Sequence, residues 1–281
     1  MLSALIGLLV VTALALAWAD RHWQSGTHAL RVELAANRQA ITPDRFDSRE
    51  LDDLPAPVQR YFRRVLEEGQ PMIATVRLTQ RGSFNLGQAE PRWSAFSSEQ
   101  FVSTRRPGFD WDGRIAVAGG LTVRVHDAYI AGEGRLSARL MGLLPLAEMR
   151  DTPALAQAEL MRYLAEAAWY PTALLPSQGP RWQAIDERNA RATLTDGATT
   201  VSLVFGFAAD GLIETVHADA RARSVDGRVE MTPWRVRLWG YELRDAMLVP
   251  LQGEASWLLP AGPTPYWRGR VASLSFEPAR R

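Results

Sequence analysis

The pattern of apolar and polar positions divides the chain into three parts. Residues 2–19 carry no charged side chain and are mostly Leu, Ala, Val and Ile. Residues 20–50 are polar and mixed, and they predict a juxtamembrane helix or linker without an obvious apolar face. From residue 51 onward, apolar positions recur first with a helical period and then with a period of two. We therefore expect residues 51–281 to form a single β-rich domain that resembles ligand-binding domains.

The charge-free segment has about the length that crosses a bilayer as a helix, and Trp18 and Trp23 stand where interfacial aromatic residues occur. Residues 1–19 are predicted to be a transmembrane anchor or an uncleaved signal. A cleaved signal peptide is the alternative, because residues 15–17 and 17–19 both have a small-x-small pattern. No Arg or Lys precedes the apolar run, which favours a retained anchor.

The orientation of this anchor rests on two opposing indications. Arg21, Arg31 and Arg38 follow the span and favour a cytoplasmic domain, whereas signal anchors usually place the following domain outside. We expect a bacterial inner-membrane protein whose domain is periplasmic or otherwise extracytoplasmic.

Two amphipathic helices are predicted in the remainder. Pro55 and Pro57 suit a first helical turn, and apolar residues follow at helical spacing from Val58 to Leu66. A second helix is predicted from about Pro153 to Trp169. The apolar residues 174–176 that follow predict a flap or a packing segment.

After Pro71 the period changes to two, which indicates β-strands. They are predicted near 72–84, 92–104, 108–118, 121–131, 134–142, 181–187, 190–196, 199–209, 212–224, 228–242, 250–259 and 265–277. Asp-Gly pairs at 196–197, 210–211 and 226–227 are typical of hairpin turns. Strands with one apolar and one polar face indicate an antiparallel sheet, and this many strands do not stay flat. The sequence therefore predicts a mainly β (α+β) fold: a large curved antiparallel sheet forming an incomplete barrel, with covering helices.

Composition excludes several classes of function. Lys and Arg total 32, Asp and Glu total 31, and the net charge is +1, so the chain is not built to neutralise nucleic-acid phosphates. All 32 basic residues are arginines, which excludes a Schiff-base lysine, and the absence of cysteine excludes disulfides and thiolate sites. No enzyme signature motif is present, and we predict no catalytic residue, cofactor, metal site or nucleic-acid partner.

Three carboxylates stand in unusual places. Asp110 and Asp112 share one strand face, where they would hold a cation, act as an acid/base pair, or, as we favour, form a solvated face neutralised by arginines. Glu99 shares a strand face with apolar residues such as Trp93 and Phe101. It is either an edge residue or a buried carboxylate paired with an arginine.

Arginines beside aromatic residues raise a similar choice. Arg235 and Arg237 share a strand face with Trp239 and Tyr241. Facing a concavity, they would bind the carboxylate or phosphate headgroup of a ligand with an apolar tail. Facing outward, they would form cross-strand ion pairs, which we favour for any given pair.

Several stretches resemble known families. The segments 54–61 (LPAPVQRY), 108–112 (GFDWD), 159–166 (ELMRYLAE), 169–176 (WYPTALLP) and 184–186 (AID) are similar to those of a bacterial family of unknown function with one N-terminal membrane span. The stretch 97–114 and the order of elements also resemble, more loosely, lipoprotein carriers of the LolA/LolB type. That second resemblance implies a curved sheet, closed by helices, that holds acyl chains.

The leading hypothesis is a membrane-anchored protein that binds or handles a lipid or other amphipathic ligand without catalysis, with residues 2–19 in the membrane and 153–176 covering the barrel mouth. The alternatives are an enzyme that uses Glu159, Glu166, Asp110 or Asp112 on a small hydrophobic substrate, and a structural envelope protein. The candidate ligand-binding residues are Trp111, Trp169, Tyr170, Leu174, Trp234, Trp239, Arg235, Arg237 and Glu99.

Overall fold

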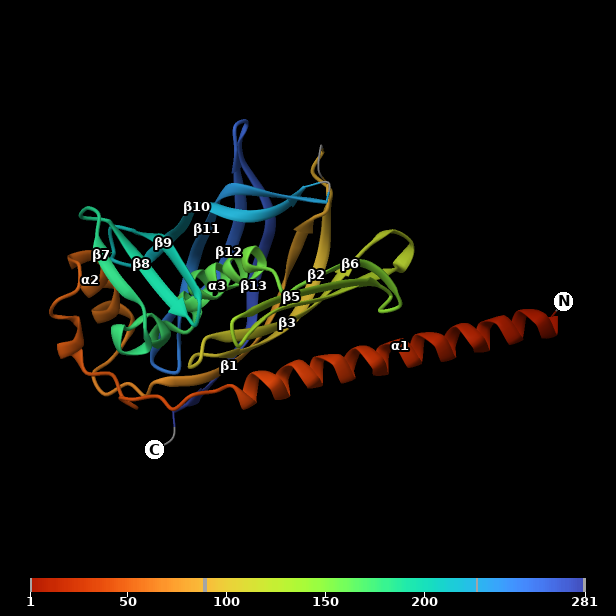
Figure 1. The fold of residues 1–281 in the computed structure, drawn as a ribbon, viewed down its shortest axis with the longest axis horizontal. Helices are drawn as coiled ribbons and strands as arrows, with labels where there is room; N and C mark the ends of the chain where they lie inside the picture. Colours follow the sequence, from red (N-terminus) through yellow and green to blue (C-terminus); the bar gives the residue numbers. More distant parts are fainter. Residues whose placement is uncertain (1, 88–89, 226, 280–281) are drawn as a thin grey trace.

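The computed structural model describes residues 2–87, 90–225 and 227–279, which form one long antiparallel sheet with three α-helices (Figure 1). The helices are α1 (Leu2–Ala36), α2 (Ala56–Val65) and α3 (Pro153–Glu166). The strands are β1 (Ile73–Asn85), β2 (Trp93–Ser103), β3 (Gly108–Ala116), β4 (Thr122–Ile130), β5 (Glu133–Leu140), β6 (Leu144–Arg150), β7 (Arg181–Ala184), β8 (Asn189–Asp196), β9 (Thr199–Phe207), β10 (Ile213–Val225), β11 (Arg228–Arg244), β12 (Met247–Leu259) and β13 (Gly262–Pro278).

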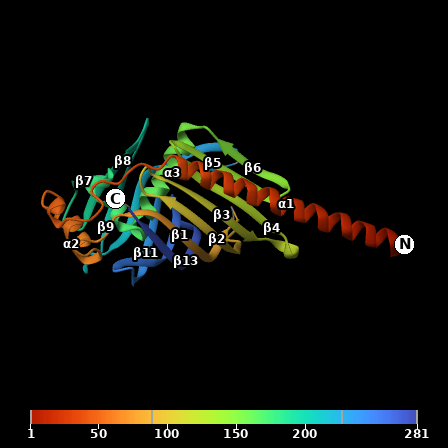
Figure 2. The same cartoon turned by 90° about the horizontal axis from the view of Figure 1, so that it is seen from below.

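The sheet is curved and open. Its strand order is β6-β5-β4-β3-β2-β1-β13-β12-β11-β10-β9-β8-β7, with neighbouring strands antiparallel. α3 contacts β3, β4 and β5 on one half and β9 and β10 on the other, so the sheet curls around this helix (Figures 1 and 2). Within the described ranges the edge strands β6 and β7 do not pair with each other. The predicted incomplete antiparallel barrel is confirmed.

The predicted strands correspond closely to those observed, with one addition. β6 was not predicted, because Leu144, Pro145 and Leu146 interrupt the alternation of apolar and polar positions. Asp196-Gly197 joins β8 to β9, and Asp210-Gly211 lies between β9 and β10. In the third predicted turn, Asp226 lies outside the described residues.

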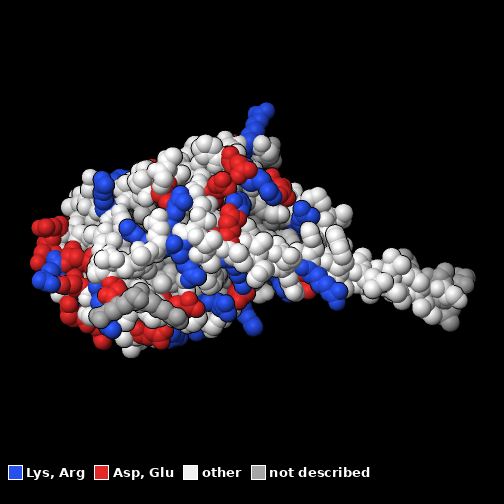
Figure 3. Space-filling model, turned by 60° about the horizontal axis from the view of Figure 1, so that its bottom comes forward, with Lys and Arg blue, Asp and Glu red and all other residues white. Residues whose placement is uncertain are grey.

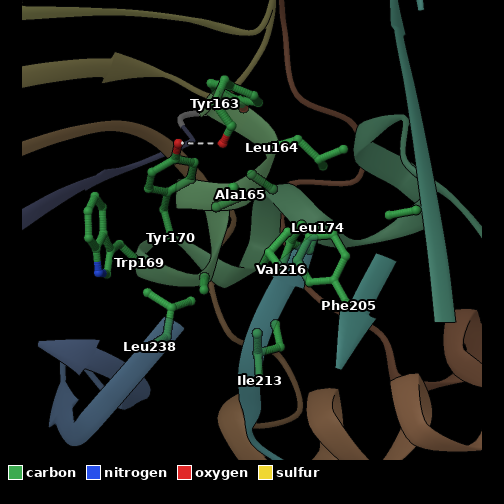
Figure 4. Close-up of a cluster of buried hydrophobic side chains, with 14 of the residues drawn as sticks. Tyr163, Leu164, Ala165, Trp169, Tyr170, Leu174, Phe205, Ile213, Val216 and Leu238 are labelled. Atoms are coloured by element: carbon green, nitrogen blue, oxygen red, sulfur yellow. Dashed lines mark hydrogen bonds between the residues drawn. The ribbon is translucent and has the colours of Figure 1, made fainter. Parts of the chain in front are cut away.

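The concave side of the sheet is filled around α3. Thr152 caps the N-terminus of this helix, because its Oγ1 accepts a hydrogen bond from the Leu155 amide at 3.2 Å. After α3, residues 167–178 form three short 3-10 turns whose side chains are largely buried. Tyr170 donates a hydrogen bond to the Tyr163 carbonyl at 3.0 Å, and Leu174 packs beside Phe205 (Figure 4). Of the two predictions for residues 174–176, the packing segment is therefore the one observed.

α1 is one continuous helix whose first half projects from the sheet. Among the described residues, it is the one helix long and apolar enough, by length and composition, to cross a membrane, a test that signal sequences also pass. The projecting end shows no charged side chain, whereas both charge signs are dispersed over the rest of the visible surface (Figure 3). The second half of α1 packs on β2, β3 and β4. Residues 20–36 therefore continue the helix and carry a docking face, in which the buried Trp23 and Leu34 stand beside the polar Thr27 and Arg31. This face was not identified from the sequence.

Candidate functional site

A cavity of about 430 Å³ lies between α3 and the concave face of the sheet. Its walls are mostly apolar and come from β3, β4, β5 and β6 on one side and from β10, β11, β12 and β13 on the other. This volume lies within the range of about 300–1,000 Å³ that is usual for small-molecule sites. Six alanines line the cavity: Ala138, Ala154, Ala158, Ala165, Ala222 and Ala255. Their small side chains keep open a space that larger residues would fill.

Arg162 of α3 holds a charged cluster at one wall of this cavity. Its Nη1 lies 2.6 Å from Asp127 Oδ2 and its Nε lies 2.7 Å from Glu166 Oε1. The guanidinium also lies over the ring of Trp111, 5.3 Å from the centroid. Burial by itself lowers the pKa of Arg162, but the neighbouring carboxylates outweigh this and raise that pKa. Arg162 is therefore a fixed cation that holds β4 to α3.

Glu159, one turn earlier on α3, is a second buried charge centre. Its Oε1 lies 3.3 Å from Nη2 of Arg221, and Nε of Arg221 donates to the Ala158 carbonyl at 3.2 Å. Burial, and next the charge of Asp127, raise the pKa of Glu159 to about 8. Glu159 Oε2 and Asp127 Oδ1 are buried without a donor partner among the described residues. With its pKa raised to about 8, Glu159 is protonated at neutral pH and can donate that proton towards Asp127.

Three of the residues predicted to bind a ligand come together here. Trp111, Trp169 and Trp234 line the cavity from β3, from the turn after α3 and from β11. Tyr170 and Leu174 lie in the fully buried core next to Trp169, as Figure 4 shows. These two residues support the wall instead of forming its surface.

The other predicted residues lie elsewhere. Arg235, Arg237 and Trp239 are on the opposite face of β11 from Trp234, because successive side chains of a strand point to opposite sides. Arg237 and Trp239 border a separate recess at the far end of β11, and the Trp239 indole donates to Gln252 Oε1 at 3.0 Å. Trp239 is 41% exposed.

Glu99 lies on the face of the sheet that α1 covers. Its Oε2 is 2.9 Å from Nη2 of Arg31, so it pairs with an arginine as expected, but its side chain is 43% exposed and not buried. It is not an edge residue either, because β2 lies between β1 and β3. Asp110 and Asp112 lie on this same face. Asp110 pairs with Arg31 at 3.2 Å, and Asp112 Oδ1 accepts a hydrogen bond from the Trp23 indole at 3.0 Å. The favoured solvated face is thus wrong for Asp110, whose side chain is fully buried beneath α1.

Besides Arg162 of α3, two arginines of β10, Arg221 and Arg223, reach the cavity. A register shift between Ala218 and Arg221 explains why their inward direction could not be seen in the sequence. Before this bulge the even-numbered residues, such as Ala218, point inward and are buried. The extra residue reverses the alternation, so after the bulge the odd-numbered Arg221 is buried. The Arg221 guanidinium lies 4.9 Å from the centroid of the Trp234 ring, and that of Arg223 lies 5.7 Å from the Trp257 ring.

The carboxylates expected to act in an enzyme are divided by the sheet. Glu159 and Glu166 lie at the cavity, whereas Asp110 and Asp112 lie on the other face under α1. In the described part of the chain, no group of three or more His, Asp or Glu side chains is placed to hold a metal ion. The chemical character of the site is therefore an apolar cavity with one buried acid and several arginines.

Residues 52–276 match a family of unknown function (DUF6920), and the chain belongs to this family. The family resemblance found in the sequence is thereby confirmed. Among solved structures, the chain is similar to a LolA superfamily protein from Nitrosomonas europaea, with 9% sequence identity and a TM-score of 0.40, over 79% of this chain and 92% of that chain. Comparison with curated proteins finds no match.

Proposed function

We propose that this protein binds one amphipathic ligand, with an apolar tail in the cavity beside α3, and that it does so without chemical change. The observation that carries this proposal is the space itself. Elsewhere the concave side of the sheet is filled by large buried side chains such as Tyr163 and Phe205, but here six alanines and five tryptophans surround a void. An apolar void of this size is the usual site of a hydrophobic ligand in a curled sheet.

Arg223 is the proposed partner of the ligand's polar head. Arg162 is engaged by Asp127 and Glu166, and Arg221 is engaged by Glu159. Arg223 lines the cavity at a partly exposed position near the β10–β11 turn, where a carboxylate or phosphate head would remain in contact with water.

We propose that residues 2–19 anchor the protein in the bacterial inner membrane and that residues 51–281, the proposed ligand-binding domain, lie on its extracytoplasmic side. The charge-free stretch of α1 and its exposure support the anchor. The docking of the second half of α1 on the sheet supports a fixed distance between the domain and the membrane.

Titration of the detergent-solubilised full chain with a fluorescent fatty acid tests the binding. We expect saturable binding with one probe per chain and competition by unlabelled fatty acids. A fluorescence response that stays linear with probe concentration, or that unlabelled fatty acid does not displace, contradicts the proposal.

One observation favours a second candidate, an enzyme acting on a hydrophobic substrate. Glu159 has a pKa raised to about 8 in an apolar cavity, which suits a general acid. For an enzyme, lipids incubated with the protein would change in mass, and Glu159→Gln would abolish that change while the fatty acid probe still binds. For a binding protein, the mass of the recovered lipids is unchanged with both the wild type and Glu159→Gln.

A further inference from the structure

The ends of strands β3 to β6 lie beside the point where α1 leaves its charge-free segment. Gly142, in the β5–β6 turn, lies against Ala19 of α1, and Arg124 of β4 pairs with Asp20. From there α1 follows β4 away from these strand ends, and Leu34 packs near Ile130. In Figure 2, α1 runs across β3 and β4 with its N-terminal half beyond the strand ends. A bilayer that holds residues 2–19 therefore has its surface at these strand ends.

Large apolar side chains are exposed at this position. Leu144 and Leu146 of β6 are 63% and 57% exposed, and Leu121, before β4, is also exposed. Trp18 stacks on His22 at the same level of α1, with 5.2 Å between ring centroids. Grouped exposed apolar residues mark an interaction surface, and Trp at the end of an apolar helix is typical of the membrane interface. These strand ends thus match a bilayer surface in both composition and position.

A continuous apolar strip leads from these strand ends into the cavity. Side chains on the inward face form three successive cross-strand rows: Ile115, Val123 and Leu140; Gly113, Val125 and Ala138; Trp111, Asp127 and Leu136. Leu140 pairs in turn with the exposed Leu144. The rows are two residues apart, so the row with Asp127 lies about 13 Å inward from that with Val123. Val123, Val125, Leu136 and Ala138 all line the cavity.

We infer that the strand ends at residues 117–121 and 141–146 rest on the bilayer that holds α1, and that the cavity receives acyl-chain lipids sideways from that bilayer. This inference rests on the proposed function, because it names the source of the ligand. An acyl chain moving along the strip from Leu144 to Ala138 stays on apolar surface throughout. It thereby avoids exposing its methylene groups to water.

The absence of cysteine from the sequence allows the contact with the bilayer to be measured directly. Single nitroxide labels are attached at Leu144→Cys, Leu146→Cys and, as a matched control, Leu243→Cys. Leu243 is 64% exposed near the C-terminal end of β11, away from the strand ends beside α1. In vesicles of phosphatidylethanolamine and phosphatidylglycerol, we expect labels at 144 and 146 to collide with oxygen as lipid-exposed sites do, and the label at 243 to collide with a water-soluble nickel complex. Labels at 144 and 146 that behave like the control overturn the inference.

Transfer kinetics separate this inference from the proposed function. The rate of transfer of a fluorescent fatty acid from vesicles to the full chain should fall about tenfold for Leu144→Asp combined with Leu146→Asp. Its affinity in detergent should stay unchanged, and Leu243→Asp should behave as the wild type. A wild-type transfer rate in the double variant refutes access from the bilayer and leaves the cavity proposal standing. Absence of saturable binding in detergent refutes the cavity proposal itself.

Discussion

His126 and Asp127 are neighbours on β4, and they contact two different helices on opposite sides of the sheet. The His126 ring stacks on Trp23 of α1, with 4.0 Å between centroids, while Asp127 Oδ2 lies 2.6 Å from Nη1 of Arg162 on α3. The layer that supports the docked α1 is therefore the same layer that forms the cavity wall. Because strand side chains alternate, substitutions can alter either face separately.

Filling the cavity should abolish ligand binding and leave the fold intact. Ala138 lines the cavity, whereas Ala95 is exposed on the outer face of β2, so tryptophan at either position adds the same side chain to opposite faces. We expect Ala138→Trp to weaken binding of a fluorescent fatty acid at least about tenfold, equivalent to about 1.4 kcal/mol. Ala95→Trp should bind like the wild type. Equal affinities of the two variants would place the ligand elsewhere.

Removal of the Arg162 charge should destabilise the protein strongly. Arg162→Met leaves Asp127 and Glu166 without their shared cation, and breaking such a buried pair costs about 3–5 kcal/mol. Arg150→Met is the control, because Arg150 is 61% exposed and pairs with Glu148 at the surface, where an ion pair is worth about 1 kcal/mol or less. Urea unfolding followed by tryptophan fluorescence measures the unfolding free energy of both variants. Similar losses in the two variants would show that the cluster adds no stability.

The stability contributed by Glu159 should depend on pH. Its pKa is raised from 4.5 to about 8 in the folded chain, so the folded state binds more protons than the unfolded state between these values. The contribution is complete below pH 4.5 and is lost as pH rises towards 8. We expect the difference in unfolding free energy between wild type and Glu159→Gln to fall by more than about 1 kcal/mol between pH 5 and pH 8, since one pKa unit is worth about 1.4 kcal/mol. A difference that stays constant with pH argues against a buried protonated Glu159.

Arg31 should couple to Asp110 across the interface between α1 and β3. Burial raises the pKa of Asp110 to about 7, and Arg31 opposes this rise. Arg31→Met leaves the buried carboxyl without its partner and should cost about 3 kcal/mol. The double variant Arg31→Met/Asp110→Asn should be more stable than Arg31→Met alone. Amide hydrogen exchange in residues 20–36 should be faster in Arg31→Met but not in the double variant. Strict additivity of the two changes would exclude this coupling.

Much of the fold was predictable because most strands keep one apolar face. In β3, Phe109, Trp111 and Ile115 alternate with polar residues, so both the strand and its inward direction follow from the period of two. The docking of α1 was not predictable, since Thr27 and Arg31 meet polar partners that lie far away in the sequence.

The candidate site was predictable only in part. Trp111 and Trp234 were among the candidate binding residues and line the cavity, whereas Trp239, also a candidate, lies on the opposite face of β11 from Trp234. Arg235 and Arg237 were named as candidate headgroup partners but face outward on the regular β11, as was favoured for any given pair, whereas the bulge in β10 turns Arg221 inward. A bulge of this kind depends on the pairing of two strands and leaves no periodic signal in either one.

Native mass spectrometry of the full chain, released from detergent and followed by lipid extraction, tests the central claim most directly. A bound species of one acyl-bearing molecule per chain, lost in Ala138→Trp and kept in Ala95→Trp, is the result expected for a ligand in the cavity beside α3. A clean mass of the chain alone, without any shift after lipids are added, would contradict the account and favour a structural role for the sheet.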